Sequence, residues 1–451
     1  MPSVAIVGGG ISGLATAHYL AKAGIASHLF EARPRLGGVI QTERVDGCVV
    51  EGGPDSFLSA KPWAMELIAE LGLAGEVIGS NDHLRATFIW KGGKLIPLPD
   101  GVQFLVPTQL RPIAATPLLH WRTKLRMGLE YFHRRGRAGA DDRTVADFVA
   151  GHYGQEVVDY LAEPLLSGIY GGDPAELSAA SVLPNLVELE REYGSLTRGV
   201  LARRKAAAHE EKLPLFRTLR GGMAQLIAGL SSAVAGKATV VHAAVERIER
   251  TANGFRLCAG GDWLEAQRVV LACEAHQVAG LTRPIDTELS ALTGWIPYRS
   301  SMTVALGYNR SDLQHPLNGF GFLVPKKERN RLVACTWVGT KFSDRAPDGM
   351  ALLRCFLGEA LDERDEQIIA AVLIELREMM GVRARPRFTR IFRWPRSMAQ
   401  YTVGHAQRVA RIEERLAAIP GLHVVGNGYR GIGIPDCVRM AKQVAERIAR
   451  G

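Results

Sequence analysis

The hydrophobic and polar positions of the chain predict alternating strands and helices at both ends. Residues 4–7 form an apolar run with the length of one buried strand, residues 14–20 continue with helical periodicity, and residues 27–30 supply a second strand. Near the other end, residues 422–425 predict a strand and residues 438–449 a helix. Strands that alternate with helices favour a parallel sheet covered by helices, so we expect an α/β fold at both ends of the chain.

Two other patterns lie between these ends. From residue 101 to 210, helical periodicity interrupted by prolines replaces the strands, and from residue 302 to 392 short strands return. A chain of 451 residues is too long for one ordinary hydrophobic core, so we expect several domains. The predicted domains are a discontinuous α/β domain (1–85, 215–290 and 405–451), an antiparallel sheet domain (86–100 and 291–404) and a helical domain (101–214).

Parts of the helical region allow more than one interpretation. An apolar stripe among basic residues can lie on an anionic membrane surface, and the stripe here consists of Leu118, Leu119, Leu125, Leu129 and Phe132. A stripe of this kind more often packs on a core with its polar side in water, and we expect that arrangement here. Residues 163–174 predict a glycine-rich turn, and the polar residues 203–212 predict a loop.

Composition narrows the class of protein. Apolar residues make up 47% of the chain and charged residues 22%, and no apolar run has the length of a membrane-spanning helix, which is typical of a water-soluble protein. The N-terminal apolar run lacks the basic segment of a signal peptide. The six cysteines form no CxxC pair, which disfavours a structural zinc site and indicates a reducing compartment. We expect a cytoplasmic protein without a metal centre.

The net charge of +9 favours an anionic partner. Nucleic acid, an acidic lipid surface and an anionic small molecule would each fit. Nucleic-acid-binding proteins concentrate basic residues in tracts or modules, whereas the arginines here are spread thinly along the chain. The sequence therefore disfavours nucleic acid, and it leaves an acidic substrate or peripheral contact with a membrane.

The first strand runs directly into the motif GxGxxG. Strand, glycine turn and helix in this order predict a dinucleotide site, in which glycines allow a tight turn, close approach of the pyrophosphate and packing of the helix on the strand. The residues expected at the phosphates are Gly8, Gly10, Ile11, Ser12 and Gly13. Glu31 follows at about the spacing of an acid that binds a free ribose 2′-hydroxyl, which favours FAD or NAD over NADP. A glycine turn without a ligand is the alternative.

Further motifs resemble those of FAD-dependent oxidases. The segment ExxxRxGGxxxT that begins at Glu31 is similar to a signature shared by amine oxidases, phytoene desaturases and protoporphyrinogen oxidases, and EGGPDSF from Glu51 resembles the porphyrinogen-oxidase branch. The resemblance implies a Rossmann-like FAD-binding domain, an antiparallel substrate domain and a helical capping domain. It also implies FAD contacts from Glu31, Ala32, Arg35, Gly37, Gly38, Gly52, Gly53, Pro54, Asp55, Gly426, Asn427, Gly433, Ile434 and Pro435, and from the main chain of Val245.

The same resemblance implies an activity. Porphyrinogen oxidases of this branch convert an anionic porphyrinogen into the porphyrin during haem biosynthesis and pass the electrons through FAD to O2, which gives H2O2. Coproporphyrinogen III and protoporphyrinogen IX both remain open as substrates. Because the flavin N5 atom carries this chemistry, no catalytic side chain is assigned.

Substrate contacts are also implied by the resemblance. Gly168 and Tyr170 match a segment that forms one wall of the substrate cavity, and Phe322 and Trp337 lie in strands expected to face the flavin. Arg85 lies one strand repeat before the position of the family's carboxylate-binding arginine and would face the same side. The ordinary alternatives are a core tryptophan and a solvated arginine.

Other expectations concern partners and rival functions. The resemblance implies a homodimer, contact with another enzyme of the haem pathway and, in some members, docking of the helical domain on a membrane. One rival is an amine oxidase or carotenoid desaturase on the same scaffold. The other is a porphyrin-binding flavoprotein without catalytic activity.

Overall fold

The structure, a computed structural model, describes residues 4–103, 105–133, 142–206, 213–358 and 362–451. The chain divides into two compact units. The first unit comprises Met1–Ser80, Pro214–Tyr298 and Gln407–Gly451, and the second comprises Asn81–Leu213 and Arg299–Ala406. Both units are therefore discontinuous in sequence, and each has its own hydrophobic core.

A five-stranded parallel sheet forms the centre of the first unit. Its strands in spatial order are β12 (Ala238–Val241), β2 (Ser27–Phe30), β1 (Val4–Val7), β16 (Arg268–Leu271) and β22 (Leu422–Val424). Every residue of β1 is buried, because helices cover both faces of a parallel sheet and its strands therefore consist of apolar residues. The strands predicted over residues 4–7 and 27–30 are confirmed, and the one predicted over 422–425 ends one residue earlier.

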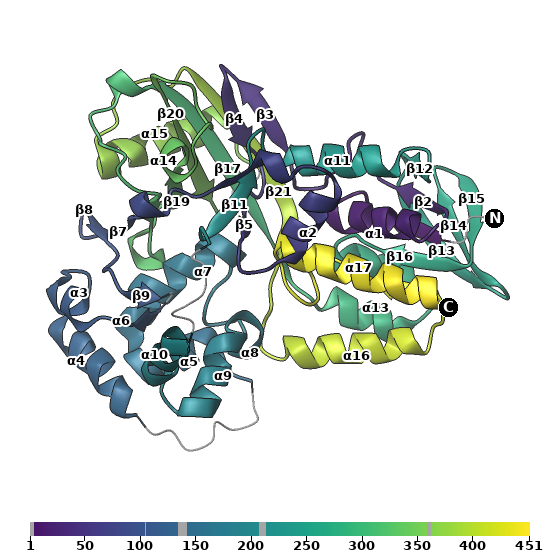
Figure 1. Cartoon of the computed structure of the whole chain (residues 1–451), viewed down its shortest axis with the longest axis horizontal. Helices are drawn as coiled ribbons and strands as arrows, with labels where there is room; N and C mark the ends of the chain where they lie inside the picture. The colour runs from purple at the N-terminus through teal and green to yellow at the C-terminus, as the bar shows by residue number, and fades with distance from the viewer. Residues whose placement is uncertain (1–3, 104, 134–141, 207–212, 359–361) are drawn as a thin grey trace. The chain divides into compact units, whose positions relative to one another are not determined.

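Helices and smaller sheets surround this sheet. The helices are α1 (Ile11–Lys22), α2 (Trp63–Glu70), η1 (Ala74–Glu76), α11 (Ala224–Val234), α12 (Ala275–Thr282), α13 (Thr287–Gly294), α16 (His405–Ala417) and α17 (Ile434–Arg450). The smaller sheets are β3 (Thr42–Val45) with β4 (Cys48–Glu51); β5 (Phe57–Leu58), β11 (Phe216–Leu219) and β6 (Val77–Gly79); and β13 (Val245–Thr251), β14 (Gly254–Ala259) and β15 (Asp262–Ala266). The first and last helices, α1 and α17, pack side by side, so both ends of the chain build one site (Figure 1).

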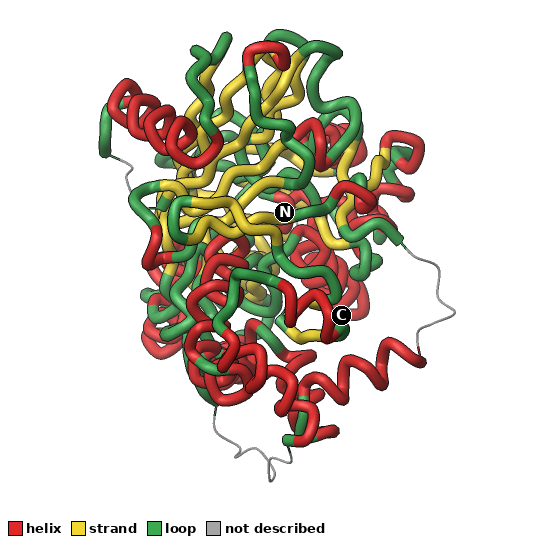
Figure 2. The backbone as a smooth tube through the Cα atoms, turned by 90° about the vertical axis from the view of Figure 1, so that its left-hand side faces the viewer, coloured by secondary structure: helices red, strands yellow, loops and turns green. Residues whose placement is uncertain are grey.

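A seven-stranded sheet forms part of the second unit. In spatial order its strands are β21 (Phe388–Ala399), β17 (Tyr298–Asn309), β20 (Met350–Leu357), β19 (Leu332–Trp337), β18 (Gly321–Leu323), β7 (Thr87–Lys91) and β8 (Lys94–Pro97). The strands lie side by side in Figure 2. β17 to β18 pair antiparallel, as predicted, but β18 runs parallel to β7. β7 and β8 pair antiparallel and lie at one edge of this sheet.

Helices complete the second unit. On the sheet side these are η2 (Asp82–Leu84), η5 (Arg310–Asp312), η6 (Lys326–Glu328), α14 (Val338–Lys341) and α15 (Asp365–Met380). The helical segment contains α3 (Leu110–Ala115), α4 (Trp121–Leu129), η3 (Glu130–Phe132), α5 (Val145–Tyr153), α6 (Gln155–Val157), the π turn η4 (Val158–Ala162), α7 (Glu163–Tyr170), α8 (Ala179–Val182), α9 (Pro184–Tyr193) and α10 (Leu196–Ala206), with the short strands β9 (Val102–Gln103) and β10 (Val106–Pro107). Within the described ranges, no helix is long and apolar enough to cross a membrane.

The helical segment and the sheet belong to one unit because the sheet is apolar on both faces near β7 and β18. Side chains alternate between the faces of a strand. Phe322 belongs to the core cluster that contains residues of α15, whereas its neighbour Leu323 and the β7 residue Ile89 pack with the helical segment. The second unit thus combines the regions predicted as separate sheet and helical domains.

Two local predictions are wrong. The segment expected to be a glycine turn is helix α7 as far as Tyr170, because Pro164 fits a first helical turn and Gly171, with φ +61°, ends the helix. Residues 203–206 continue α10 and are not a loop, and residues 207–212 lie outside the described residues.

Candidate functional site

The turn between β1 and α1 leaves no space for side chains at two glycines. Gly8 has φ +108°, and a Cβ atom there would lie 2.7 Å from the carbonyl oxygen of Ala272. A Cβ atom on Gly13 would lie 1.8 Å from the carbonyl oxygen of Gly8. Both positions therefore require glycine. The turn places the start of α1 at the carboxyl end of β1, where the first N–H groups of the helix can bind an anion.

A second glycine turn lies directly against the first. The Gly37 N–H donates to the carbonyl oxygen of Gly9 at 2.8 Å, and Gly10 and Gly37 form a β-bridge. A Cβ atom on Gly38 would lie 3.3 Å from the Cα atom of Gly10. Two main-chain segments therefore meet without an intervening side chain, which creates a backbone surface suited to a diphosphate.

Arg35 holds the second turn in shape. Its guanidinium donates to the carbonyl oxygens of Leu36, Gly38 and Ile40, at 3.3, 2.6 and 3.2 Å. The resemblance implied a contact between this residue and FAD. The geometry shows that much of its donor capacity is directed at the main chain of its own loop.

Glu31 ends the strand next to β1 and is buried. One carboxylate oxygen accepts from the Gly9 N–H at 2.8 Å and the other from the Arg33 N–H at 2.9 Å. Each oxygen keeps a second lone pair, so the carboxylate can still accept from two ribose hydroxyls. Ala32 is exposed beside it, and Val245 begins β13 after the end of β12, the strand that pairs with β2.

The Gly52–Asp55 segment follows β4 and runs along the main chain after the second glycine turn. Gly52 N–H donates to the carbonyl oxygen of Gln41 at 2.8 Å, and a Cβ atom on Gly53 would lie 1.8 Å from the carbonyl oxygen of Val39. Pro54 and Asp55 continue this segment and are half-buried. Gly53 therefore has to be glycine for the two segments to pack.

Two residues that the sequence did not assign to the site connect its second glycine segment to the start of α11. The carboxylate of Glu51 accepts from the Thr42 hydroxyl at 2.7 Å and from the Met223 N–H at 2.8 Å. The Thr42 hydroxyl accepts from the Ala224 N–H at 3.0 Å. Together they cap the N-terminus of α11. Their positions at the ends of the quoted motifs were visible in the sequence, but their capping role required the tertiary structure.

The loop between β22 and α17 is a further part of the site. Val425 N–H donates to the carbonyl oxygen of Leu271 at 3.0 Å, and the chain then turns at Gly426, which has φ +135°. The side-chain oxygen of Asn427 accepts from the Tyr298 hydroxyl at 3.4 Å. No sequence motif pointed to Tyr298, because it contacts this loop from a residue far away in the chain.

Helix α17 begins beside the start of α1. Gly433 is its N-cap residue, and Ile434 and Pro435 form its first turn. Asp436 forms an ion pair with Lys61 at 2.5 Å, a contact that the sequence did not suggest. Burial raises the pKa of Cys437 to about 11, although a hydrogen bond with Ser12 opposes this shift, so the thiol is protonated at neutral pH.

Two predicted substrate residues lie on α7 in the second unit. Gly168 is exposed, and a Cβ atom there would lie 3.7 Å from the Leu323 side chain of β18. Tyr170 ends the helix, and its carbonyl oxygen accepts from the Gln400 side chain at 2.7 Å. The Tyr170 ring contacts the Tyr401 ring edge to face, with 6.2 Å between centroids. The structure thus brings the end of α7 against the segment after β21.

Phe322 and Trp337, which were predicted as substrate contacts, lie in a hydrophobic core of the second unit. Both side chains are 1% exposed and belong to the core cluster that contains residues of α15. Trp337 packs between Phe88 and His315, at centroid distances of 5.5 and 4.8 Å. These rings therefore fill the core, which is the ordinary place for aromatic residues of a strand. Arg85 lies just before β7 and is exposed.

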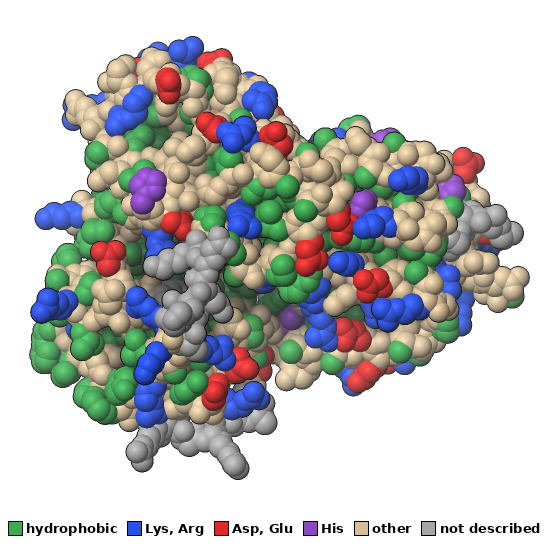
Figure 3. Space-filling view, viewed as in Figure 1, with side chains coloured by type: hydrophobic (Ala, Val, Ile, Leu, Met, Phe, Trp, Pro, Cys, Tyr) green, Lys and Arg blue, Asp and Glu red, His purple; other side chains and the backbone are tan. Residues whose placement is uncertain are grey.

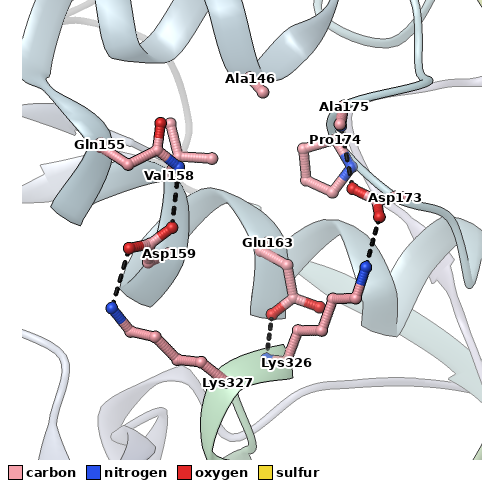
Figure 4. Close-up of a pocket in the computed structure, with 10 residues that line it drawn as sticks. All are labelled: Ala146, Gln155, Val158, Asp159, Glu163, Asp173, Pro174, Ala175, Lys326 and Lys327. Atoms are coloured by element: carbon pink, nitrogen blue, oxygen red, sulfur yellow. Dashed lines mark hydrogen bonds and ion pairs between the residues drawn. The ribbon is translucent and has the colours of Figure 1, made fainter.

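A hollow of about 400 Å³ lies among α5, α6, the π turn, α7 and η6 (Figure 4). The ammonium groups of Lys326 and Lys327 pair with Asp173 at 2.7 Å and Asp159 at 2.8 Å. The lining contains none of the predicted substrate residues. Glu163, the third carboxylate of the lining, pairs with Arg329 at 2.8 Å. Because each of these charges has a partner, this hollow does not indicate a charged ligand. Among the described residues no group of side chains could hold a metal ion.

Known proteins resemble this chain over nearly its full length. The family described as flavin containing amine oxidoreductase matches residues 11–449. Coproporphyrinogen III oxidase of Bacillus subtilis (strain 168) is 34% identical, with 97% of this chain and 96% of that protein covered. The enzyme of the same name from Propionibacterium freudenreichii is 33% identical, and the match covers 98% of this chain and 90% of that protein. A protein from Exiguobacterium sp. 255-15, named putative protoporphyrinogen oxidase, is 32% identical. Its crystal structure superposes on this chain with a TM-score of 0.89, and the match covers 99% of this chain and 98% of that one.

The described residues fit FAD. Gly8, Gly10 and Gly38 keep side chains away from the meeting point of the two turns, where the pyrophosphate would lie. Glu31 retains acceptor capacity for the ribose, and the starts of α1 and α17 offer N–H groups to negative charge. The glycine turns and the acid agree with the sequence expectation.

Proposed function

The chain belongs to the flavin containing amine oxidoreductase family, and from this premise we propose that it oxidises coproporphyrinogen III to the porphyrin in haem biosynthesis. The observation that carries the proposal is the end-to-end match with curated relatives of that name, at 33% and 34% identity. The intact glycine turns support a catalytic flavoprotein. FAD is the cofactor and O2 the electron acceptor.

The protein's contribution is to bind and orient the reactants. FAD, when bound, supplies two-electron oxidation in three rounds, with O2 as final acceptor and H2O2 as product. The two glycine turns would hold the phosphates of FAD, and Glu31 would hold its ribose. The dipole of α17 would stabilise negative charge on a ligand that binds at the N-terminus of this helix.

Substrate recognition depends on charge. Coproporphyrinogen III carries four carboxylates and protoporphyrinogen IX two, so the net charge of +9 suits either and favours the former. Gly168 and Tyr170 at the end of α7 are proposed as substrate contacts, and exposed Arg85 as a carboxylate partner.

Turnover with the two porphyrinogens tests the proposal. We expect kcat/KM for coproporphyrinogen III to exceed that for protoporphyrinogen IX by about tenfold or more, because hydrogen bonds to charged groups contribute about 1.5–3 kcal/mol each. The measurement is aerobic porphyrin fluorescence with purified holoenzyme, with H2O2 counted in parallel. Faster oxidation of protoporphyrinogen IX would reverse the substrate assignment. Oxidation of neither, with FAD bound, would refute it and leave amine oxidation as the next reaction to assay.

The apolar stripe of α4 and η3 favours contact with a membrane surface. The expectation that it packs on the core is confirmed for Leu118 and Leu119, which are 0% and 3% exposed. It is wrong for the rest of the stripe, which Trp121 extends: Trp121 is 61% exposed, Leu125 55%, Leu129 57% and Phe132 73%. The first three recur at every fourth residue and therefore share one helix face. Figure 3 shows hydrophobic side chains gathered over α3 and α4, at the lower left.

Basic residues accompany this stripe. Arg111, Arg122 and Arg126 are exposed on the same two helices. An apolar face flanked by arginines suits insertion into the interface of an anionic bilayer. We therefore propose that the helical segment binds the surface of anionic membranes.

Cosedimentation with lipid vesicles tests this proposal. We expect binding to phosphatidylglycerol vesicles to exceed binding to phosphatidylcholine vesicles. The variant Leu125→Ser/Phe132→Ser should bind about a hundredfold more weakly or worse, since burial of each large apolar side chain contributes about 1.5–3 kcal/mol. Trp295→Ser is the control, because Trp295 is 73% exposed in the first unit. Equal binding of wild type and the double variant would refute the proposal.

A further inference from the structure

Tyr298 is the residue at which the chain leaves the first unit, and it begins β17. Its hydroxyl accepts a hydrogen bond from the Ala275 N–H at 3.1 Å and donates to the side-chain oxygen of Asn427 at 3.4 Å. Ala275 begins α12 after β16, and Asn427 lies in the loop after β22. β16 and β22 are neighbouring parallel strands. The Tyr298 hydroxyl therefore connects the two segments that follow the carboxyl ends of these strands.

The loop is shaped to receive this hydroxyl. A Cβ atom on Gly428 would lie 2.5 Å from the Tyr298 oxygen, so a side chain there would displace it. The Tyr298 ring packs edge to face against His276, with 5.3 Å between centroids and planes inclined at 80°. Burial raises the pKa of Tyr298 well above its ordinary value, so the hydroxyl stays neutral and can both donate and accept.

A fixed hydroxyl matters because the loop is otherwise permissive. Gly426 and Gly431 have φ angles of +135° and +115°, and Gly428 lies between them, so the free segment could adopt many conformations. Ordering such a segment only when a ligand binds would lower affinity, whereas a segment already held in place binds without that cost.

We propose that Tyr298 is a positioning residue of the flavin site, which holds Asn427 and the Gly426–Gly428 loop against the start of α12 before FAD binds. The role concerns cofactor binding and does not depend on which substrate is oxidised. Tyr298 itself is not a catalytic residue, because it acts through Asn427 and the loop main chain.

The variant Tyr298→Phe tests the proposal, since it removes one oxygen and keeps the ring. We expect the Kd for FAD to rise about five- to thirtyfold, because the Ala275 N–H and the Asn427 oxygen each lose a hydrogen-bond partner in a partly buried place. The Kd is measured by flavin fluorescence during titration into apoprotein. The midpoint potential of bound flavin, measured by dye equilibration, is expected to shift as well, which a merely structural role would not cause.

Tyr308→Phe is the matched control. The Tyr308 hydroxyl is also buried, but it has no hydrogen-bond partner among the described residues, and it belongs to the second unit. This variant should keep the wild-type Kd for FAD. In the double variant Tyr298→Phe/Asn427→Ala, the loss of FAD-binding free energy should be smaller than the sum of the losses in the two single variants. An unchanged Kd in Tyr298→Phe, an equal rise in Tyr308→Phe, or strict additivity with Asn427→Ala would overturn the proposal.

Discussion

The Gly13→Ala variant is expected to lose FAD, with a Kd raised about a hundredfold or more. The added methyl group would lie 1.8 Å from the carbonyl oxygen of Gly8. That oxygen belongs to main chain between β1 and α1, so it cannot move aside as the end of a flexible side chain can. The helix would have to shift away from the strand, which would open the turn that receives the phosphates. Equilibrium dialysis with FAD and the flavin absorbance of purified protein measure the loss.

Gly280→Ala is the control for this prediction. Gly280 also lies within a helix of the first unit, α12, and a Cβ atom there would have no heavy atom within 4 Å. Alanine favours a helix over glycine by about 1 kcal/mol, so this variant should retain FAD and be equally or slightly more stable. Full FAD binding by Gly13→Ala would show that the closeness of β1 and α1 is not needed for the site.

The second large effect is expected at His152, which is buried in the helical segment. Its Nδ1 lies 2.9 Å from a carboxylate oxygen of Glu130, and its Nε2 lies 3.0 Å from one of Glu190. Carboxylate oxygens accept, so both ring nitrogens must donate and the ring is an imidazolium. Glu190 also pairs with Arg143, so two carboxylates face two cations.

Glu130 connects this ion network to neighbouring helices. Its carboxylate accepts from the Ser195 hydroxyl at 3.0 Å and from the N–H groups of Leu196 and Thr197 at 2.7 and 3.1 Å. It therefore caps the N-terminus of α10 and at the same time fixes η3, in which it lies. Loss of the imidazolium would remove the positive charge that pairs with the buried carboxylate of Glu130.

His152→Leu is expected to lower the free energy of unfolding by about 3–5 kcal/mol, because it removes one partner of a buried ion network. Urea unfolding followed by circular dichroism measures the loss. His133→Leu is the control, since the His133 ring lies 6.0 Å from that of His152 but its Nδ1 has no hydrogen-bond partner within the described ranges. A loss below about 1 kcal/mol in His152→Leu would contradict the charged network.

The same variant should show a defined pH dependence. Burial lowers the pKa of His152, but hydrogen bonds to Glu130 and Glu190 outweigh it and raise the pKa above 6.5. Burial likewise opposes ionisation of Glu190, but hydrogen bonds from His152 and Arg143 lower its pKa to about 2. A raised histidine pKa stabilises the fold below pH 6.5, and this contribution is lost as the pH rises through the shifted value. A lowered carboxyl pKa stabilises above pH 4.5, and this contribution is lost toward pH 2.

The difference in unfolding free energy between wild type and His152→Leu should therefore be largest between about pH 4.5 and 6.5 and become smaller at alkaline pH. Urea titrations at several pH values measure it. A difference that stays constant from neutral to alkaline pH would show that His152 does not carry a proton in the folded protein.

Much of the first unit could be predicted from the sequence, and much of the substrate region could not. The predictions for β1 and α1 are confirmed, because a glycine turn between a buried strand and a helix depends on residues close together in the chain. α7 was missed because its glycines suggested a turn, although Pro164 and Gly171 are suitable residues for the two ends of a helix. The face of the sheet toward which Phe322 and Trp337 point depends on α15, which lies elsewhere in the sequence.

The sequence by itself determined the type of cofactor site and the family, because glycine spacing and a strand-ending acid act through neighbouring main chain. Only the tertiary structure decided that Tyr298 reaches Asn427, that Lys61 pairs with Asp436 and that His152 lies between two carboxylates. Only the tertiary structure decided, too, that Leu125 and Phe132 face outward. Each of these contacts joins residues from separate elements, and the burial of a helix face depends on what packs against it, so no local pattern encodes either.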